Sequence, residues 1–296
     1  MTRSKPTDDL PKPDPRRHVW RDDLAAEGLW DRVLVPRYEA GRPHQLLRPS
    51  APMRRGPDKT LAFDNEVLFG ESLRVYDVAE GWAWVQLDRD RYVGYVPADG
   101  LVAEVVKPTH RVQALGTFIY PRADMKSPPI MPLSCNSLVA IKGGDDKFCE
   151  LTTGGFVVTR HTVEIAKKAR DYVEVAERFV GVPYLWGGRT RLGVDCSGIV
   201  QIALDAAGMV CPRDSDMQQD EVGNAVLIPN DLEGLHRGDL VFWKGHVGMM
   251  IDGVMLLHAN AHHMAVAVEP LEVAVRRIAR SGSEIVAIRR PGLTSP

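Results

Sequence analysis

One cysteine and two histidines in the second half of the chain are residue types suited to nucleophilic catalysis. Cys196 lies in the run Gly193-Val194-Asp195-Cys196-Ser197-Gly198, directly before an apolar segment with helical spacing that ends at Gly208. Free N–H groups and the positive end of the dipole at a helix start stabilise a thiolate and lower the pKa of a thiol. We therefore expect Cys196 to be a nucleophile with a lowered pKa. The alternative is a small, buried helix residue without chemistry.

A thiol nucleophile needs a base, and the base needs a partner that orients it. His246 begins and His258 ends two apolar runs that meet at Asp252-Gly253, a pattern typical of a β-hairpin. A two-residue turn would place the histidines on opposite faces of the hairpin. A three-residue loop over residues 251–253 would place His246 directly opposite His258. The catalytic interpretation requires this three-residue loop.

Composition restricts the classes of function. The chain has 296 residues, enough for two or three domains, with 44% hydrophobic and 26% charged residues. Its net charge of −2 gives no sign of a nucleic-acid partner or an acidic membrane surface. The N-terminus has no apolar signal segment, and no apolar stretch is long enough to span a membrane. We therefore expect a cytoplasmic location.

The cysteines and the remaining histidines offer little support for a metal site. Cys135, Cys149, Cys196 and Cys211 lack zinc-ligand spacing and are too sparse for a disulfide scaffold. A metal site built on His258, His262 and His263 is an alternative to the catalytic interpretation, but no carboxylate or thiolate at ligand spacing completes it. We expect neither a metal nor another cofactor.

Four segments of the chain differ in pattern. Residues 1–16 combine prolines with charges and predict a mobile tail. Residues 17–104 contain an N-terminal segment and then short apolar runs separated by Gly, Asp and Asn, and residues 105–161 repeat such runs more weakly. Both patterns predict small all-β barrels. We place the last domain at residues 162–296.

The pattern changes from β to α after residue 161. Apolar residues recur every three or four positions from Val163 to Val180 and predict a helix that ends near Gly181. A second helix should begin at Cys196, and strands should follow near residues 239–243, 246–251, 254–259, 264–268 and 284–289. Helices followed by strands with short turns predict an α+β domain with an antiparallel sheet.

Two parts of the chain resemble known bacterial families. The run from Phe69 to Val96, with its alternating aromatic residues and glycines, resembles the bacterial SH3-like domains of cell-wall enzymes. Residues 162–292 resemble the NlpC family of papain-like cysteine peptidases, which cut cell-wall peptides. The motifs that carry this second resemblance occur in the family's order: Pro183-Tyr184-Leu185-Trp186-Gly187-Gly188, Asp195-Cys196-Ser197-Gly198, Arg237-Gly238-Asp239-Leu240-Val241-Phe242-Trp243, His246-Val247-Gly248-Met249 and His258-Ala259. The implied fold is a papain-like α+β domain, with N-terminal helices packed on an antiparallel sheet, preceded by two SH3-like barrels.

The resemblance to the peptidases implies a role for each matching residue. Cys196 would be the nucleophile, His246 the general base and later acid, and His258 the residue that orients His246. The hydroxyl of Tyr184, with the N–H of Cys196, would stabilise the oxyanion. Asp195 and Ser197 would hold the D-glutamyl part of the substrate. Helix capping is an alternative role for these two residues, and both roles are compatible.

Family members with tandem SH3-like domains are often specific for short wall peptides with a free N-terminal L-alanine. Asp214, with Ser215 beside it, is our candidate for the carboxylate that binds the ammonium. The first barrel would contribute one or more of the following residues: Glu66, Glu80, Tyr92 and Tyr95. An acetylated peptide would leave a buried carboxylate unpaired and would be rejected.

The expected activity is that of a cysteine endopeptidase that hydrolyses the γ-D-glutamyl–L-diamino acid bond of murein peptides. It would release L-Ala-γ-D-Glu during recycling of cell-wall peptides. The alternatives are a wall-acting murein hydrolase targeted by its barrels, an acyltransferase or amidase with the same thioester intermediate, and an inactive binding protein of the same fold. The expected partner is a murein peptide. The oligomeric state and the choice between diaminopimelate and lysine stay open.

Overall fold

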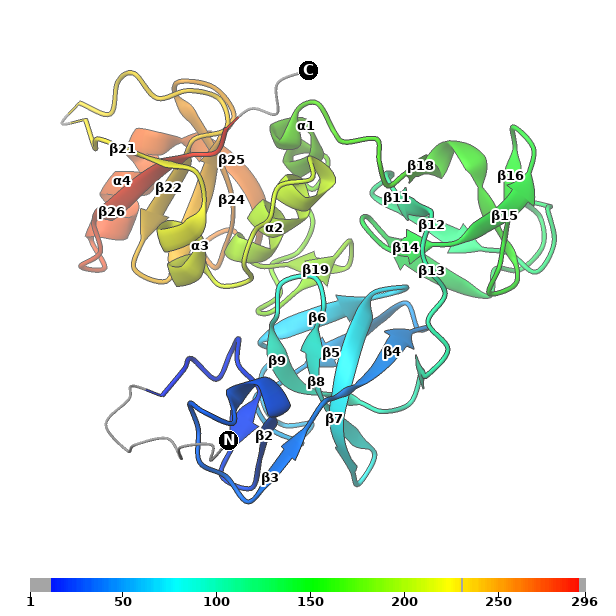
Figure 1. The fold of residues 1–296 in the computed structure, drawn as a ribbon. Coiled ribbons are helices and arrows are strands. Elements are labelled where there is room, and N and C mark those ends of the chain that lie inside the picture. Colours follow the sequence, from blue (N-terminus) through cyan, green and yellow to red (C-terminus); the bar gives the residue numbers. More distant parts are fainter. Residues whose placement is uncertain (1–11, 230, 293–296) are drawn as a thin grey trace.

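The computed structural model describes residues 12–229 and 231–292 of the chain. Figure 1 shows three groups of elements: an N-terminal β unit in blue and cyan, a second β unit in green, and a mixed unit of helices and strands from green to red. Among the described residues, no helix combines the length and the apolar character that crossing a membrane requires.

The first β unit is built around a five-stranded antiparallel sheet with the order β10-β4-β7-β8-β9. Its core contains the alternating apolar side chains of these strands, among them Leu73, Val75 and Val85. The strands of the sheet are β4 (Arg42–Leu46), β7 (Ser72–Ala79), β8 (Trp82–Leu87), β9 (Val93–Pro97) and β10 (Leu101–Val102). Beside it lie β1 (Trp20–Arg21), β2 (Leu24–Ala26), a 3-10 helix (Glu27–Leu29) and β3 (Arg37–Glu39), and the pair β5 (Ser50–Met53) and β6 (Asn65–Leu68).

The second β unit consists of small antiparallel sheets around Val112, Leu133 and Leu151. Its elements are β11 (His110–Val112), β12 (Gly116–Ile119), β13 (Met131–Ser134), β14 (Leu138–Val139), β15 (Ile141–Gly144), β16 (Phe148–Leu151), β17 (Phe156–Val158), a 3-10 helix (Thr159–His161) and β18 (Thr162–Glu164). Strand β18 pairs with β11 and so continues this unit beyond residue 161.

The C-terminal unit contains a six-stranded antiparallel sheet with the order β21-β26-β22-β23-β24-β25. Helices α1 and α2 pack against Leu240 and Phe242 on one face of the sheet, whereas α4 packs against Val241 and Trp243 on the other. Successive side chains of a strand point to opposite faces, so β22 contributes to both cores. The helices are α1 (Tyr172–Glu177), α2 (Cys196–Ala206), α3 (Ser215–Glu221) and α4 (Leu271–Ala279). The strands are β19 (Arg189–Thr190), β20 (Gly193–Val194), β21 (Asn224–Val226), β22 (Leu240–Trp243), β23 (His246–Met250), β24 (Met255–Asn260), β25 (Ala265–Pro270) and β26 (Ile285–Arg290).

Two predictions about the helices need correction. The helix expected from Val163 begins only at Tyr172, because residues 162–164 pair with β11 and the side chain of Asp171 caps the helix by accepting from the N–H of Val173 at 2.8 Å. Helices α3 and α4 were not expected either, although the apolar residues of α4 recur at helical spacing.

A mobile tail was predicted for residues 1–16. Residues 1–11 lie outside the described part of the chain, whereas residues 13–16 contact the rest of the molecule. Trp20 Nε1 donates to the carbonyl of Pro13 at 2.8 Å, and the N–H of Val93 donates to the carbonyl of Arg16 at 2.8 Å. These contacts contradict a mobile tail for residues 13–16.

Candidate active site

Cys196 is the first residue of helix α2 and is only 7% exposed. The carboxylate of Asp195 caps the helix by accepting from the N–H of Gly198 at 2.7 Å, and it also accepts from the N–H of Gly187 at 2.8 Å. Strand β23 lies against the thiol, and the N–H of Val247 donates to its sulfur. Burial, followed by the charge of Asp195, raises the pKa of the Cys196 thiol to about 12. The predicted lowering of this pKa is therefore wrong, because burial outweighs the helix start.

The structure brings His246 and His258 together through a hairpin register that differs from the predicted one. Met249 pairs with Leu257, and the N–H of Ile251 donates to the carbonyl of Met255, so the loop comprises residues 252–254 instead of 251–253. The shift is two residues, which leaves both histidines on the same face of the sheet. His246 Nε2 and His258 Nδ1 are 2.9 Å apart.

Glu269, which the sequence analysis did not single out, extends this pair. His258 is fully buried, and its Nε2 lies 2.8 Å from Oε1 of Glu269, which also binds the guanidinium of Arg277. Glu269 is on β25, two residues beyond the partner of His258 in the strand register, and so faces the same side. The only sequence signal for Glu269 is the alternation of side-chain direction along β25, which places it on the same face as the partner of His258.

Burial keeps both imidazoles neutral. Burial, with a smaller contribution from His258, lowers the pKa of His246 to about 3. Burial also lowers the pKa of His258, against the opposing effect of the Glu269 carboxylate. The pKa of Glu269 itself is lowered, because contacts with His258 and Arg277 outweigh its burial. The resulting set is a neutral thiol, two neutral imidazoles and an ionised carboxylate.

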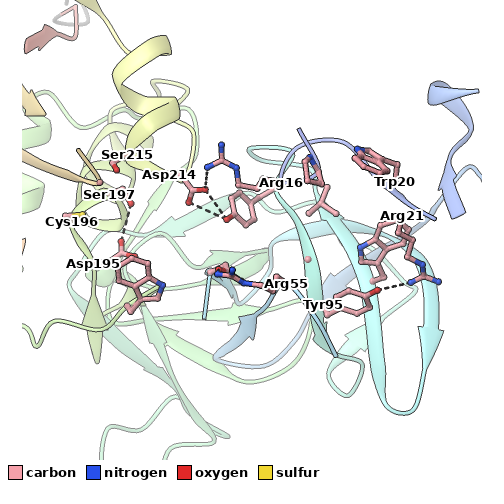
Figure 2. Close-up of a pocket in the computed structure, with 18 of the residues that line it drawn as sticks. Arg16, Trp20, Arg21, Arg55, Tyr95, Asp195, Cys196, Ser197, Asp214 and Ser215 are labelled. Carbon is pink, nitrogen blue, oxygen red and sulfur yellow. Dashed lines mark hydrogen bonds and ion pairs between the residues drawn. The ribbon is translucent and has the colours of Figure 1, made fainter. Parts of the chain in front are cut away.

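A cavity of about 560 Å³ lies between the C-terminal unit and the first β unit (Figure 2). The C-terminal unit contributes these predicted residues to its lining: Tyr184, Asp195, Cys196, Ser197, Asp214 and Ser215. The first β unit contributes Tyr92 and Tyr95. Neither His246 nor His258 is part of the lining, although Gly245 is.

Asp214 lies where the two units meet. Its Oδ2 accepts from the hydroxyl of Tyr92 at 3.2 Å and from the guanidinium of Arg16 at 2.9 Å. Burial raises the pKa of Asp214, with Arg213 and Arg16 acting against it. Tyr92 therefore contacts the predicted carboxylate, whereas Arg16 was not predicted and comes from the distant N-terminal segment.

The structure engages Asp195 and Ser197 with a buried arginine. Arg213 donates to both carboxylate oxygens of Asp195, at 2.9 and 2.7 Å, and to the hydroxyl of Ser197 at 2.8 Å. Asp195 also caps helix α2 through the N–H of Gly198, so the alternative role of helix capping is present for this residue. Burial, followed by electrostatic interactions with Cys196 and Asp195, raises the pKa of Tyr184, which keeps its hydroxyl protonated beside the thiol.

Two predicted substrate-binding residues lie outside the cavity. Glu66 accepts from the N–H of Arg189 at 2.8 Å and from the hydroxyl of Ser50 at 3.2 Å, so its carboxylate joins the two units instead of facing the cavity. Glu80 occupies the turn between β7 and β8 with a φ of 50° and lines a separate pocket of about 150 Å³. Both assignments need correction, because the barrel presents these positions on other surfaces.

Within the described part of the chain, no group of three or more His, Cys, Asp or Glu side chains is arranged to hold a metal ion. His263 instead binds the side chain of Asn260, and its ring contacts that of His262.

A buried thiol at a helix start, packed against a sheet that carries paired histidines, is the arrangement of a papain-like cysteine peptidase. Residues 181–277 match the NlpC/P60 family, and residues 53–101 match the bacterial dipeptidyl-peptidase SH3 domain. The chain therefore contains an NlpC/P60 cysteine peptidase domain preceded by an SH3 domain of the bacterial dipeptidyl-peptidase type.

Relatives with assigned names match most of the chain. It is 28% identical over 250 residues to a γ-D-glutamyl-L-lysine dipeptidyl-peptidase of Bacillus subtilis, a match that covers 76% of this chain and 80% of that protein. It is 23% identical over 240 residues to dipeptidyl-peptidase 6 of Lysinibacillus sphaericus, covering 73% and 87%. Among solved structures, an NlpC/P60 family protein from Bacillus cereus has the same fold, with a TM-score of 0.71 at 21% identity over 84% of this chain and 99% of that chain.

Proposed function

We propose that this protein hydrolyses the γ-D-glutamyl–L-diamino acid bond of murein peptides with a free N-terminal L-alanine and releases L-Ala-γ-D-Glu. The observation that carries the proposal is a single cavity that contains both Cys196 and Asp214, a carboxylate that also contacts Tyr92 of the first β unit. Relatives in Bacillus subtilis and Bacillus cereus are named γ-D-glutamyl-L-lysine dipeptidyl-peptidases, which agrees with this chemistry. We further propose a role in cytoplasmic recycling of wall peptides, with residues 17–104 and 105–164 as SH3-like barrels.

In the proposed mechanism, Glu269 determines which nitrogen of His246 is the base. An ionised carboxylate only accepts hydrogen bonds, so His258 must donate from Nε2 and accept at Nδ1. His246 must then donate from Nε2, which leaves its Nδ1 with a lone pair. That nitrogen takes the proton of the Cys196 thiol.

The sulfur of Cys196 attacks the γ-carbonyl carbon of D-glutamate as its proton moves to His246. The hydroxyl of Tyr184 and the N–H of Cys196 donate to the oxyanion of the tetrahedral intermediate. His246 then protonates the amine of the diamino acid, which leaves, and a thioester forms on Cys196. Water, deprotonated by His246, attacks the thioester carbonyl, the C–S bond breaks to release the dipeptide, and His246 returns the proton to the sulfur of Cys196.

At the other end of the bound dipeptide, Asp214 would pair with the ammonium of L-alanine. An acetylated amine carries no charge and would not form this ion pair, so Asp214 would keep only Arg16 and Tyr92 as partners among the described residues. Ser215 lies beside it in the lining. Arg213 holds Asp195 and Ser197 in place. The backbone N–H groups of these two residues and the hydroxyl of Ser197 would donate to the α-carboxylate of D-glutamate.

The test compares free and blocked peptides. Wild-type protein is incubated with L-Ala-γ-D-Glu-L-Lys, with the diaminopimelate tripeptide, and with the N-acetylated form of each, and the products are identified by mass. We expect L-Ala-γ-D-Glu only from the free-amine peptides. Cys196→Ala should abolish the cleavage, whereas Cys149→Ala, which removes a buried thiol in the second β unit, should retain it. Equal cleavage of the acetylated peptides, or cleavage only of intact wall, would contradict the proposal.

A further inference from the structure

Residues 13–18 form a strap that joins the first β unit to the peptidase domain across one wall of the cavity. On the barrel side, the side chain of Gln86 donates to the carbonyl of Arg17 at 2.8 Å, and the N–H of Val93 donates to the carbonyl of Arg16 at 2.8 Å. On the peptidase side, the guanidinium of Arg17 pairs with Glu221 in α3. The strap is therefore held from both sides.

The side chain of Arg16 points from this strap to Asp214 (Figure 2). Its guanidinium pairs with Asp14 at 2.8 Å, with Asp214 at 2.9 Å and with Asp216 at 2.8 Å, although the side chain is 38% exposed. Three carboxylates thus hold one cation in the cavity wall. The contact with Asp214 is made to Oδ2, and among the described residues Oδ1 of Asp214 has only the hydroxyl of Tyr92, at 3.4 Å, as a partner. Oδ1 is free to accept from the ammonium of a short substrate.

Beyond Arg16, the cavity continues to side chains that bind one another (Figure 2). Arg21 donates to the hydroxyl of Tyr95 at 3.0 Å and lies over the ring of Trp84, 4.6 Å from its centroid. Trp84 and Tyr95 are stacked on each other. Of these three residues only Arg21 is charged, and its guanidinium already has partners. This end of the cavity therefore gives no unpaired charged group from these residues to the N-terminus of a longer peptide.

We propose that Arg16 is a specificity-determining residue, whose guanidinium occupies the place that the N-terminal ammonium of a peptide one residue longer would take. This inference rests on the proposed function. A longer peptide would have to displace a cation paired with three carboxylates, and its own charge would be repelled by that cation. The cavity would thus accept peptides that begin with L-Ala-γ-D-Glu and reject those extended at the N-terminus.

The test measures kcat/KM for L-Ala-γ-D-Glu-L-Lys and for the same peptide with an N-terminal glycine. In Arg16→Ala, Asp14 and Asp216 lose their shared cation and become available to the ammonium of the longer peptide. We expect the preference for the shorter peptide to fall at least tenfold. Asp216→Asn, which loosens Arg16 without touching the lining, should shift the preference in the same direction by less. Arg48→Ala is the matched control, because it removes an arginine from an exposed pair with Asp99 in the first β unit, outside the strap, and it should keep the wild-type preference.

The outcomes separate this inference from the proposed function. If Arg16→Ala and Asp216→Asn both cleave the shorter peptide with an unchanged preference, the role of Arg16 is refuted and the proposed function stands. If the wild-type protein cleaves neither peptide, the proposed function itself fails.

Discussion

Cys196 and His246 both lie where burial disfavours charge. The same loss of water that raises the pKa of the thiol lowers that of the imidazole, so both groups are neutral at rest near pH 7. Proton transfer then accompanies the attack of the sulfur instead of preceding it. This differs from a preformed thiolate–imidazolium pair, which would react with any small electrophile at neutral pH.

Alkylation of Cys196 by iodoacetamide should therefore keep accelerating as the pH rises. Only the thiolate reacts, and its fraction grows about tenfold per pH unit below the thiol pKa. We expect the rate of inactivation to rise from pH 6 to pH 10 without a plateau. Mass spectrometry of the labelled Cys196 peptide corrects for the other free cysteines. A plateau below pH 8 would show a preformed ion pair and contradict the neutral pair.

Glu269 should affect turnover more than binding, because it contacts His258 and lies outside the cavity lining. Glu269→Leu removes the acceptor that orients both imidazoles, and we expect kcat to fall by about 10²–10⁴, the range of general acid–base contributions. Glu269→Gln keeps an acceptor oxygen and should lose less. KM should change little in both. Glu272→Gln in the same helix region alters only an exposed pair with Arg276 and should behave like wild type. A changed KM with an unchanged kcat would refute the positioning role.

At the scale of elements, the loop before α2 sets the position of the thiol. Gly187 in this loop has a φ of +76°, and its N–H donates to Asp195. A Cβ at this position would lie 2.6 Å from Cβ of Phe63 and 2.8 Å from its carbonyl group, in the first β unit. The loop is thus packed directly against the barrel.

Gly187→Ala and Gly181→Ala together separate backbone strain from this contact. Gly181 has a similar φ of +87°, but a Cβ there would meet nothing within 4 Å. We expect Gly181→Ala to cost about 1–2 kcal/mol through its backbone conformation. Gly187→Ala should cost about 1–3 kcal/mol more, because Phe63 must move. Urea unfolding measures both free energies. Equal losses would show that the loop and the barrel are not tightly packed.

At the scale of the whole molecule, buried ionic contacts join the peptidase domain to the first β unit. The guanidinium of Arg189 on β19 pairs with Glu71 at 3.0 Å and donates to the carbonyl of Glu66 at 2.7 Å. The side chains of Arg189 and Glu71 are almost fully buried. The barrel that supplies Tyr92 to the cavity is therefore positioned by buried charges, which are costly in free energy when they lack an ionic partner.

Arg189→Met should destabilise the protein by an amount toward the lower end of the about 3–5 kcal/mol that removing one partner of a buried pair usually costs. The cost is at the lower end because Glu71 would keep Arg89 as its cationic partner. Lys142→Met, which breaks an exposed pair with Glu150, should cost no more than about 1 kcal/mol. Urea unfolding followed by tryptophan fluorescence measures both changes. A similar cost for the two variants would mean that the junction is solvated.

Local pattern alone located several parts of the fold. The start of a helix at Cys196 follows from a polar, Gly-rich approach to an apolar run of helical spacing, and α2 begins at that residue. Alternating apolar runs predicted strands near 246–251 and 254–259, and β23 and β24 occupy nearly these positions. Such features depend on residues close together in the chain, which is why the sequence determines them.

Contacts between distant residues were decided only by the tertiary structure. Arg16 and Asp214 are 198 positions apart, and no periodicity links them. Glu66 faces Arg189 instead of the cavity because of how the two units pack. The pKa of Cys196 rises because the fold buries the thiol, which its place at a helix start does not reveal. Burial and long-range charge pairing arise from packing, so only the folded chain defines them.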